Sequence, residues 1–211
     1  NSLATLLEIF KDMKILEKTN LEFDEFLNYY QTYNHYLWDL YKHRKIEKTH
    51  LSVERFRGTF NHFNINDEEM AQQFAQEYVT VSPTKTKLFP NAIEVLSSLA
   101  MKYQMHIITN GFSEVQFVKL ENSGLAPFFQ KIITSEMLGV QKPNPEIFVY
   151  SLQQANAQVE ESIMIGDDQD SDINGAQSIG MDQVFVDYDD QKLVCKPTFH
   201  VHSLMELLSI F

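Results

Sequence analysis

Four aspartates lie within six positions of the segment "IMIGDDQDSDINGA", which spans residues 163–176. They are Asp167, Asp168, Asp170 and Asp172, and they follow directly on an apolar run. Clustered carboxylates of this kind bind a hard cation such as Mg²⁺, or they cap the start of a helix and otherwise face solvent. The residue types alone leave both interpretations open.

Polar residues of other types follow two further apolar segments. Thr109, Asn110 and Gly111 come directly after "HII", and Lys142 follows "KIITS" by a short loop. In open parallel α/β sheets, ligands bind beyond the carboxyl ends of the strands. If the apolar segments are parallel strands, we expect a hydroxyl, a cation and carboxylates to meet at one edge of the sheet.

This combination is suited to binding a phosphoryl group beside a divalent ion. A phosphate takes hydrogen bonds from a hydroxyl and from backbone N–H groups at a helix start, and a cation balances its charge. Thr109 and the amides around Asn110 and Gly111 provide the donors, Lys142 the cation and Asp167 the magnesium ligand. Each residue has a plainer interpretation as a turn residue or a solvated side chain. Their common order along the chain favours a site.

The elements that position these residues are predicted from residue 90 onward, where short apolar segments alternate with helical patterns. Strands are predicted at 105–109, 131–135 and 162–166, with outer strands at "QVFV" and "TFHV". Ser113 and Gln116 predict a capping box, and Asn144 with Pro145 predicts another helix start. A further helix is expected from about Ser171 to Gly180, and "SLMELLSIF" is expected to close the chain as a helix.

The first part of the chain has a different composition. Residues 1–82 contain one glycine, Gly58, and no proline, whereas the other six glycines and all six prolines lie between Pro83 and Pro197. Apolar residues recur at helical spacing in this part, as in Leu3, Leu6, Leu7 and Phe10. We therefore predict a helical bundle over residues 1–85 and an α/β domain over residues 86–211.

Charge and cysteine content exclude several classes of partner. The chain has 17 basic and 29 acidic residues, a net charge of −12, which argues against a nucleic acid polymer or an anionic membrane as a partner. Cys195 is the single cysteine, and no apolar run reaches the roughly 20 residues that span a bilayer. A soluble cytoplasmic protein is expected, as a monomer or homodimer.

His200 and His202 are predicted on one face of an outer strand. With no third ligand near them in the sequence, a structural role is favoured over a metal site.

Three segments together resemble motifs of the haloacid dehalogenase superfamily: "IITNGF", "KPNPEIF" and "IGDDQDSD", in that order. The resemblance implies a doubly wound parallel, Rossmann-like sheet with a separate α-helical cap. It also implies that Thr109 binds phosphoryl oxygens and that Lys142 neutralises charge on the nucleophile and the phosphate. Asp167 would ligate Mg²⁺, and Asp172 would ligate the ion or hold its water. Asp168 and Asp170 match no required position.

The first motif of that superfamily, Asp-x-Asp-x-Thr, does not occur in these residues. In the superfamily its first aspartate forms an aspartyl-phosphate and its second protonates the leaving group, and the motif lies on the central strand just before the helical cap. We expect about 10 to 20 further residues upstream of Asn1, a length set by one strand and its loop.

Residues 33–56 resemble the cap of bacterial 5′-nucleotidases that act on pyrimidine and related deoxyribonucleoside monophosphates. Asn34 and Arg55 are candidate substrate contacts. The nearby aromatic residues are expected to pack in the bundle core; they are Tyr36, Trp38 and Phe56.

The leading hypothesis is a magnesium-dependent phosphomonoesterase that acts through an aspartyl-phosphate, with a nucleoside 5′-monophosphate as substrate. The alternatives are a phosphatase of another small phosphorylated metabolite, or an inactive protein that binds a phosphate compound or a partner if the upstream aspartates are absent. A dehalogenase is disfavoured because that chemistry needs no metal ligand. A response-regulator receiver is disfavoured because its acidic residues precede the Thr and Lys.

Overall fold

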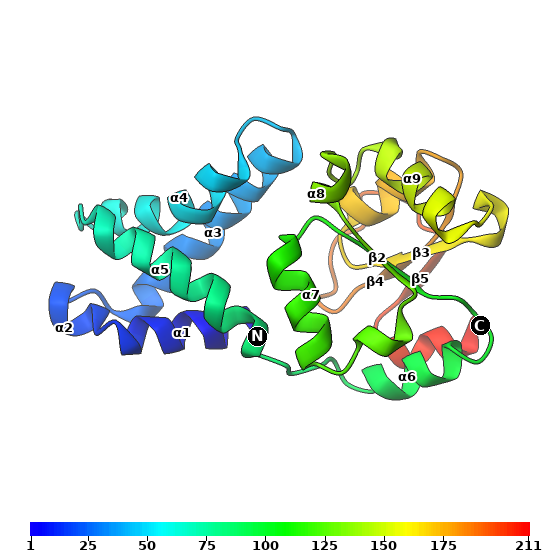
Figure 1. The fold of residues 1–211 in the computed structure, drawn as a ribbon, viewed down its shortest axis with the longest axis horizontal. Coiled ribbons are helices and arrows are strands. Elements are labelled where there is room, and N and C mark those ends of the chain that lie inside the picture. Colours follow the sequence, from blue (N-terminus) through cyan, green and yellow to red (C-terminus); the bar gives the residue numbers. More distant parts are fainter. The chain divides into compact units, whose positions relative to one another are not determined.

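The computed structural model describes residues 1–211, which divide into two compact units, Asn1–Lys87 and Leu88–Phe211 (Figure 1). The first unit is entirely helical. Its helices are α1 (Ser2–Asp12), α2 (Ile15–Thr19), α3 (Phe23–Lys42), α4 (Lys48–His62) and α5 (Glu68–Val81), followed by the 3₁₀ turn η1 (Ser82–Thr84).

Aromatic side chains form the core of the first unit. Phe26 lies at its centre, with the ring centroids of Phe10, Phe60 and Phe74 between 5.4 and 5.5 Å away. Phe56 is fully buried, which confirms its predicted place in the core. Tyr36 was expected there too, but its side chain is 55% exposed, so that expectation is wrong. It lies on the outer surface of α3, beside Tyr33 three residues earlier.

The second unit places parallel strands among helices (Figure 1). The strands are β1 (His106–Thr109), β2 (Lys131–Thr134), β3 (Ile163–Gly166), β4 (Asp182–Val186) and β5 (Phe199–Val201). The α-helices are α6 (Ala92–Leu99), α7 (Ser113–Asn122), α8 (Ser135–Leu138), α9 (Pro145–Ala155) and α10 (Gly175–Gln177). Shorter helical segments are η2 (Ala126–Phe128), η3 (Val159–Glu161), η4 (Gln169–Asn174) and η5 (Leu204–Ser209).

All strand pairs are parallel, in two groups, β1–β2 and β3–β4–β5. Helices cover both faces of the strands. One apolar cluster joins α6 and η5 to β4, and another joins α9 and α10 to β2 and includes Ile108 of β1 and Met164 of β3. The predicted α/β fold with a separate helical bundle is confirmed.

β1 and β3 differ from the other strands in burial. All their residues are only half-buried, whereas Gln183 to Val186 of β4 are buried. No strand pairing joins β1 to β3, so each strand pairs on one side only.

Local signals at helix ends were predicted with mixed success. Asn144 caps α9 as predicted, because its side chain accepts a hydrogen bond from the Glu146 N–H at 2.9 Å. The predicted capping box at Ser113 is wrong, since α7 begins at Ser113 itself and the Ser113 hydroxyl lies 2.7 Å from that of Thr134. The closing segment forms a helix as expected, the 3₁₀ helix η5.

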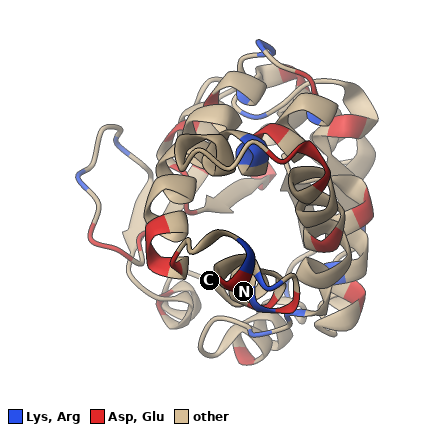
Figure 2. Ribbon diagram, turned by 90° about the vertical axis from the view of Figure 1, so that its left-hand side faces the viewer, with Lys and Arg blue, Asp and Glu red and all other residues tan.

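Acidic residues occur on many helices and loops, as Figure 2 shows. No helix is long and apolar enough to cross a membrane.

Candidate functional site at the carboxyl ends of the strands

Thr109 and Asn110 lie at the end of β1, as the sequence predicted, and each makes a local hydrogen bond. The Thr109 hydroxyl oxygen accepts a bond from the Gly111 N–H at 3.0 Å. Asn110 uses both ends of its side-chain amide on one residue: its Nδ2 donates to the Lys142 carbonyl at 2.9 Å, and its Oδ1 accepts from the Lys142 N–H at 2.8 Å. Asn110 therefore fixes the backbone of Lys142 beside the end of β1.

The Lys142 side chain is 10% exposed and forms an ion pair with Asp172, whose side chain is 6% exposed. A buried charge of either sign is unfavourable unless it is paired, and removing one partner of such a pair costs about 3–5 kcal/mol. This pair connects the loop between α8 and α9 to η4, which follows β3. The structure thus brings two of the predicted site residues into direct contact.

Gly166, the last residue of β3, allows Asp172 to approach closely. A Cβ at position 166 would lie 2.2 Å from Oδ2 of Asp172 and 2.5 Å from its Cβ, so no larger residue fits without moving the aspartate. Oδ2 also accepts a hydrogen bond from the Asp168 N–H at 3.2 Å. Asp172 is therefore held from three sides, by Gly166, Asp168 and Lys142.

Asp167 directly follows β3 and reaches solvent. Partial desolvation raises the pKa of its carboxyl, and the negative charge of Asp172 raises that pKa further, whereas Lys142 acts in the opposite direction. A carboxylate with a raised pKa beside a second carboxylate gains from a nearby cation, because the cation relieves the repulsion.

Asp168 and Asp170 have different roles from Asp167 and Asp172. The Asp168 side chain caps η4 by accepting hydrogen bonds from the N–H groups of Asp170, at 3.0 Å, and Ser171, at 2.8 Å. This confirms the predicted capping role of Asp168. Asp170 is exposed.

Tyr188 was missed by the sequence analysis. It lies two residues beyond the end of β4, and burial, followed by the charge of Asp167, raises the pKa of its hydroxyl. Its ring stacks on Phe89 with centroids 4.3 Å apart. Its position just after the predicted strand "QVFV" is a signal of the same kind that identified Thr109 and Asp167.

The donor set fits a magnesium ion. Asp167 presents a solvent-facing carboxylate, and Asp172 packs directly over Gly166, where a side chain would exclude it. Hard oxygen ligands with room for water are the environment that Mg²⁺ prefers. Both oxygens of Asp172 already have partners, Lys142 and the Asp168 N–H, so Asp172 is suited to holding a water of the ion.

The two candidate contacts in the helical unit have different environments. The Arg55 guanidinium lies 4.8 Å from the ring centroid of Phe56 and 4.5 Å from that of Tyr78, and the residue is 4% exposed. Oδ1 of Asn34 is buried and has no hydrogen-bond partner.

Comparison with known proteins gives a consistent picture. The family model described as haloacid dehalogenase-like hydrolase matches residues 4–186. Pyrimidine 5′-nucleotidase YjjG of Escherichia coli (strain K12) is 33% identical over 181 residues, which cover 84% of this chain and 79% of that protein. Glyceraldehyde 3-phosphate phosphatase of Methanocaldococcus jannaschii is 34% identical over 137 residues, covering 63% of this chain and 60% of that protein.

The fold is also similar to that of a solved structure, the HAD-hydrolase YfnB from Bacillus subtilis bound to magnesium. The TM-score is 0.89 at 29% identity, and the match covers 99% of this chain and 90% of that one.

Proposed function

Because the chain belongs to the haloacid dehalogenase-like hydrolases, we propose that it is a magnesium-dependent phosphomonoesterase whose substrate is a nucleoside 5′-monophosphate. The observation that carries the proposal is the buried Lys142–Asp172 pair, held by Asn110 beside the end of β1 and next to Asp167. A phosphoryl group needs this combination of cation, hydroxyl and metal-binding carboxylates.

In this proposal the phosphoryl group binds at the end of β1. The Thr109 hydroxyl and the N–H groups around Asn110 and Gly111 donate hydrogen bonds to its oxygens, and the Gly111 N–H exchanges its bond to the Thr109 hydroxyl oxygen for one to the phosphate. Lys142 balances the negative charge of the phosphoryl group, and Asn110 holds the Lys142 backbone beside the end of β1. Asp167 would hold Mg²⁺, with Asp172 holding a water of the ion. When bound, the ion supplies charge neutralisation at the phosphoryl oxygens.

The nucleophile is assigned to an aspartate on a further parallel strand between β1 and β3. Two observations support this placement: both strands pair on one side only, and their residues are only half-buried. A strand inserted there would bring its carboxyl end beside Thr109 and Asp167. The aspartate would attack phosphorus to form an aspartyl-phosphate, a second acid would protonate the departing oxygen, and water would then release phosphate.

We assign the helical unit, predicted as residues 1–85, the role of a cap that contacts the leaving group, and residues 86–211 the role of the hydrolytic core. Oδ1 of Asn34 is a buried acceptor without a hydrogen-bond partner, an unfavourable state that a donor from a ligand would relieve, so Asn34 stays the candidate substrate contact of this unit. The similarity to a pyrimidine 5′-nucleotidase over 84% of the chain favours a nucleotide. The shorter match to a glyceraldehyde 3-phosphate phosphatase supports a sugar phosphate as the second candidate.

The test is phosphate release by the full-length protein from a panel of pyrimidine and purine nucleoside monophosphates and triose phosphates, with Mg²⁺ and with a chelator. We expect release that requires Mg²⁺ and a kcat/KM that is highest for pyrimidine monophosphates. Highest activity on triose phosphates would overturn the substrate assignment alone. No release from any ester would overturn the assignment as an enzyme.

A further inference from the structure

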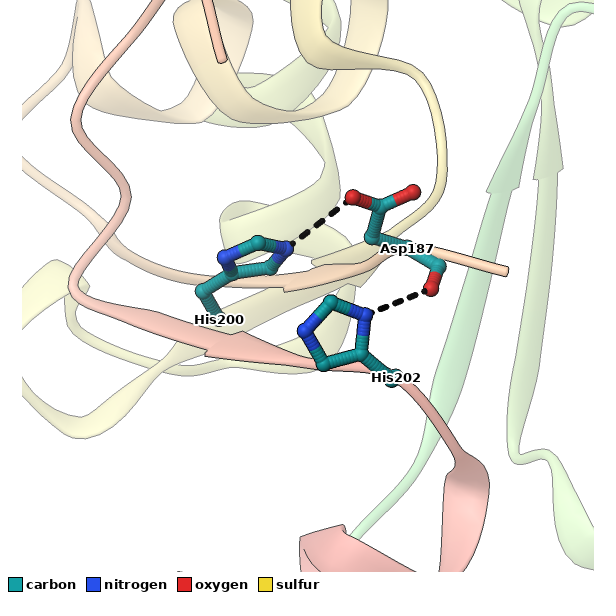
Figure 3. Close-up of side chains that lie close together, drawn as sticks. All are labelled: Asp187, His200 and His202. Carbon is teal, nitrogen blue, oxygen red and sulfur yellow. Dashed lines mark hydrogen bonds and ion pairs between the residues drawn. The ribbon is translucent and has the colours of Figure 1, made fainter. Parts of the chain in front are cut away.

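A second group of potential metal ligands lies at the outer edge of the β3–β4–β5 sheet. Asp187 directly follows β4, His200 lies in β5, and His202 directly follows β5. Figure 3 shows the three side chains gathered together. One oxygen of Asp187, a ring nitrogen of His200 and a ring nitrogen of His202 all lie within 4.8 Å of one another.

Strand geometry explains why the histidines meet. Residues two apart on a strand point to the same face, so His200 and His202 project together, with ring centroids 4.7 Å apart. The parallel pairing of β4 with β5 sets Val186 opposite Val201, which places Asp187 beside both histidines. Nε2 of His200 is 3.2 Å from Oδ2 of Asp187, and Nδ1 of His202 is 3.2 Å from the Asp187 carbonyl oxygen.

The Asp187 carboxylate is held in place before any ion binds. Its side chain is 1% exposed, and Oδ1 accepts hydrogen bonds from the N–H groups of Asp189, at 3.2 Å, and Gln191, at 3.0 Å. The Gln191 N–H also lies 3.0 Å from Oδ2, so these bonds fix the orientation of the carboxylate. A fixed ligand loses little conformational freedom when it binds a metal ion.

The spacing suits a tetrahedral ion. Ligand atoms about 2.0–2.1 Å from a Zn²⁺ ion in tetrahedral geometry are roughly 3.3 Å apart. The His200–Asp187 separation of 3.2 Å already matches this edge. A ring nitrogen of His202 lies within 4.8 Å of the other two ligand atoms, and the side chain is 55% exposed, so it has room to turn.

The ligand types indicate the class of ion. Two imidazoles with one carboxylate favour Zn²⁺ and related transition ions over Mg²⁺, which prefers an all-oxygen environment. The Asp190 carboxylate is 3.5 Å from Nδ1 of His202 and is able to close the fourth position. The sequence analysis favoured a structural role for the two histidines because it found no third ligand. Asp187, brought alongside by strand pairing, is that ligand, so the reason for that preference was wrong.

We propose that Asp187, His200 and His202 form a binding site for a divalent transition-metal ion of the Zn²⁺ class, separate from the magnesium site assigned to Asp167 and Asp172. A bound ion would tie the loop of residues 187–191 to the edge strand β5.

The experiment is calorimetric titration of the full-length, metal-stripped protein with Zn²⁺ while millimolar Mg²⁺ occupies the other site. The variants are His200→Ala and His202→Ala, and the matched control is His50→Ala, which removes an exposed histidine from the helical unit. We expect one equivalent of Zn²⁺ to bind to the wild type and to the control. Each ligand variant should weaken binding at least about tenfold.

A second measurement guards against an indirect effect of the substitutions on folding. In ¹H–¹⁵N spectra of the wild-type imidazoles, Zn²⁺ should shift the resonances of Nε2 of His200 and Nδ1 of His202 and leave those of His50 in place. Zn²⁺ binding that is as strong in both ligand variants as in the wild type would overturn the proposal. Ring resonances of His200 and His202 that Zn²⁺ does not move would overturn it as well.

Discussion

At the scale of single residues, the types of the site residues were visible in the sequence, but their partners were not. Thr109, Lys142 and Asp167 were chosen because each follows a predicted strand. The backbone N–H groups around Asn110 were expected to bind phosphate, but nothing in the sequence indicated that its side chain binds the Lys142 backbone, 32 residues away in the chain. Such a contact depends on which loops meet at the sheet edge, and a single sequence does not specify that pairing.

Gly166→Ala tests the close approach of Asp172. The added Cβ would lie 2.2 Å from Oδ2 of Asp172, so the aspartate has to move and its contact with Lys142 changes. Displacement by about 1 Å in an active site costs about a hundredfold in rate, and we expect a loss of that size in kcat/KM for phosphate release.

The control is Gly180→Ala, where a new Cβ meets nothing within 4 Å but the backbone φ is +78°. Strain there should lower the free energy of unfolding by about 1 kcal/mol and leave kcat/KM unchanged. If kcat/KM were the same for Gly166→Ala and Gly180→Ala, the close approach of Asp172 to Gly166 would not matter for activity, which would contradict this account.

His106 gives a pH-dependent prediction. Burial lowers the pKa of its imidazole below the ordinary value of 6.5, with a smaller contribution from Lys131, and Nδ1 is buried with no hydrogen-bond partner. As pH falls below 6.5, the unfolded chain takes up a proton that the folded protein does not accept until its lower pKa is reached. Folding stability is therefore lost across that interval.

Urea unfolding of wild type and His106→Gln from about pH 7.5 to about pH 5.5 checks this. Stability of the wild type should fall more steeply with decreasing pH than that of the variant. Parallel profiles would show that His106 titrates alike in both states.

At the scale of elements, strands and capped helices were predicted well where the signal is local. The apolar runs of β1, β2 and β3 lie within a residue of their predicted bounds, because a short continuous apolar segment between turn residues is a local signal for a strand. The predicted capping box at Ser113 does not form, because both polar groups of Ser113 have tertiary partners. Its hydroxyl is bonded to that of Thr134, and its N–H donates to the Glu136 carboxylate at 2.7 Å. Neither residue is near Ser113 in sequence.

The N-cap of α9 provides a prediction at this scale. Asn144→Ala removes the acceptor of the Glu146 N–H, and we expect the free energy of unfolding to fall by about 1 kcal/mol. Gln154→Ala, at an exposed position of the same helix, is the control and should change stability by no more than about 0.5 kcal/mol. Urea unfolding at neutral pH measures both. A cost at Gln154 equal to that at Asn144 would contradict the capping account.

At the scale of the whole molecule, the unequal distribution of glycine and proline predicted two architectures, and the chain does divide into a helical unit and an α/β unit. Helices need neither residue in their interiors, whereas the turns between strands and helices use both. The arrangement of the strands in two groups could not be predicted from the sequence, because strand pairing depends on the topology of the fold and not on the local residue pattern. The Asp187–His200–His202 cluster escaped for the same reason.

The central claim is that Asp167, not the aspartate cluster in general, holds the metal for phosphate release. Asp167→Asn and Asp170→Asn remove one charge each, three positions apart, and Asp170 is exposed. Substitution at Asp167 also leaves the buried Lys142–Asp172 pair intact, which keeps the effect separate from misfolding.

The deciding measurement is the rate of phosphate release by the full-length protein as a function of Mg²⁺ concentration, for wild type and both variants. We predict that Asp167→Asn lowers the rate at saturating Mg²⁺ by about a hundredfold or more, while Asp170→Asn stays within about twofold of wild type. Equal rates and equal Mg²⁺ dependence in all three proteins would contradict the account.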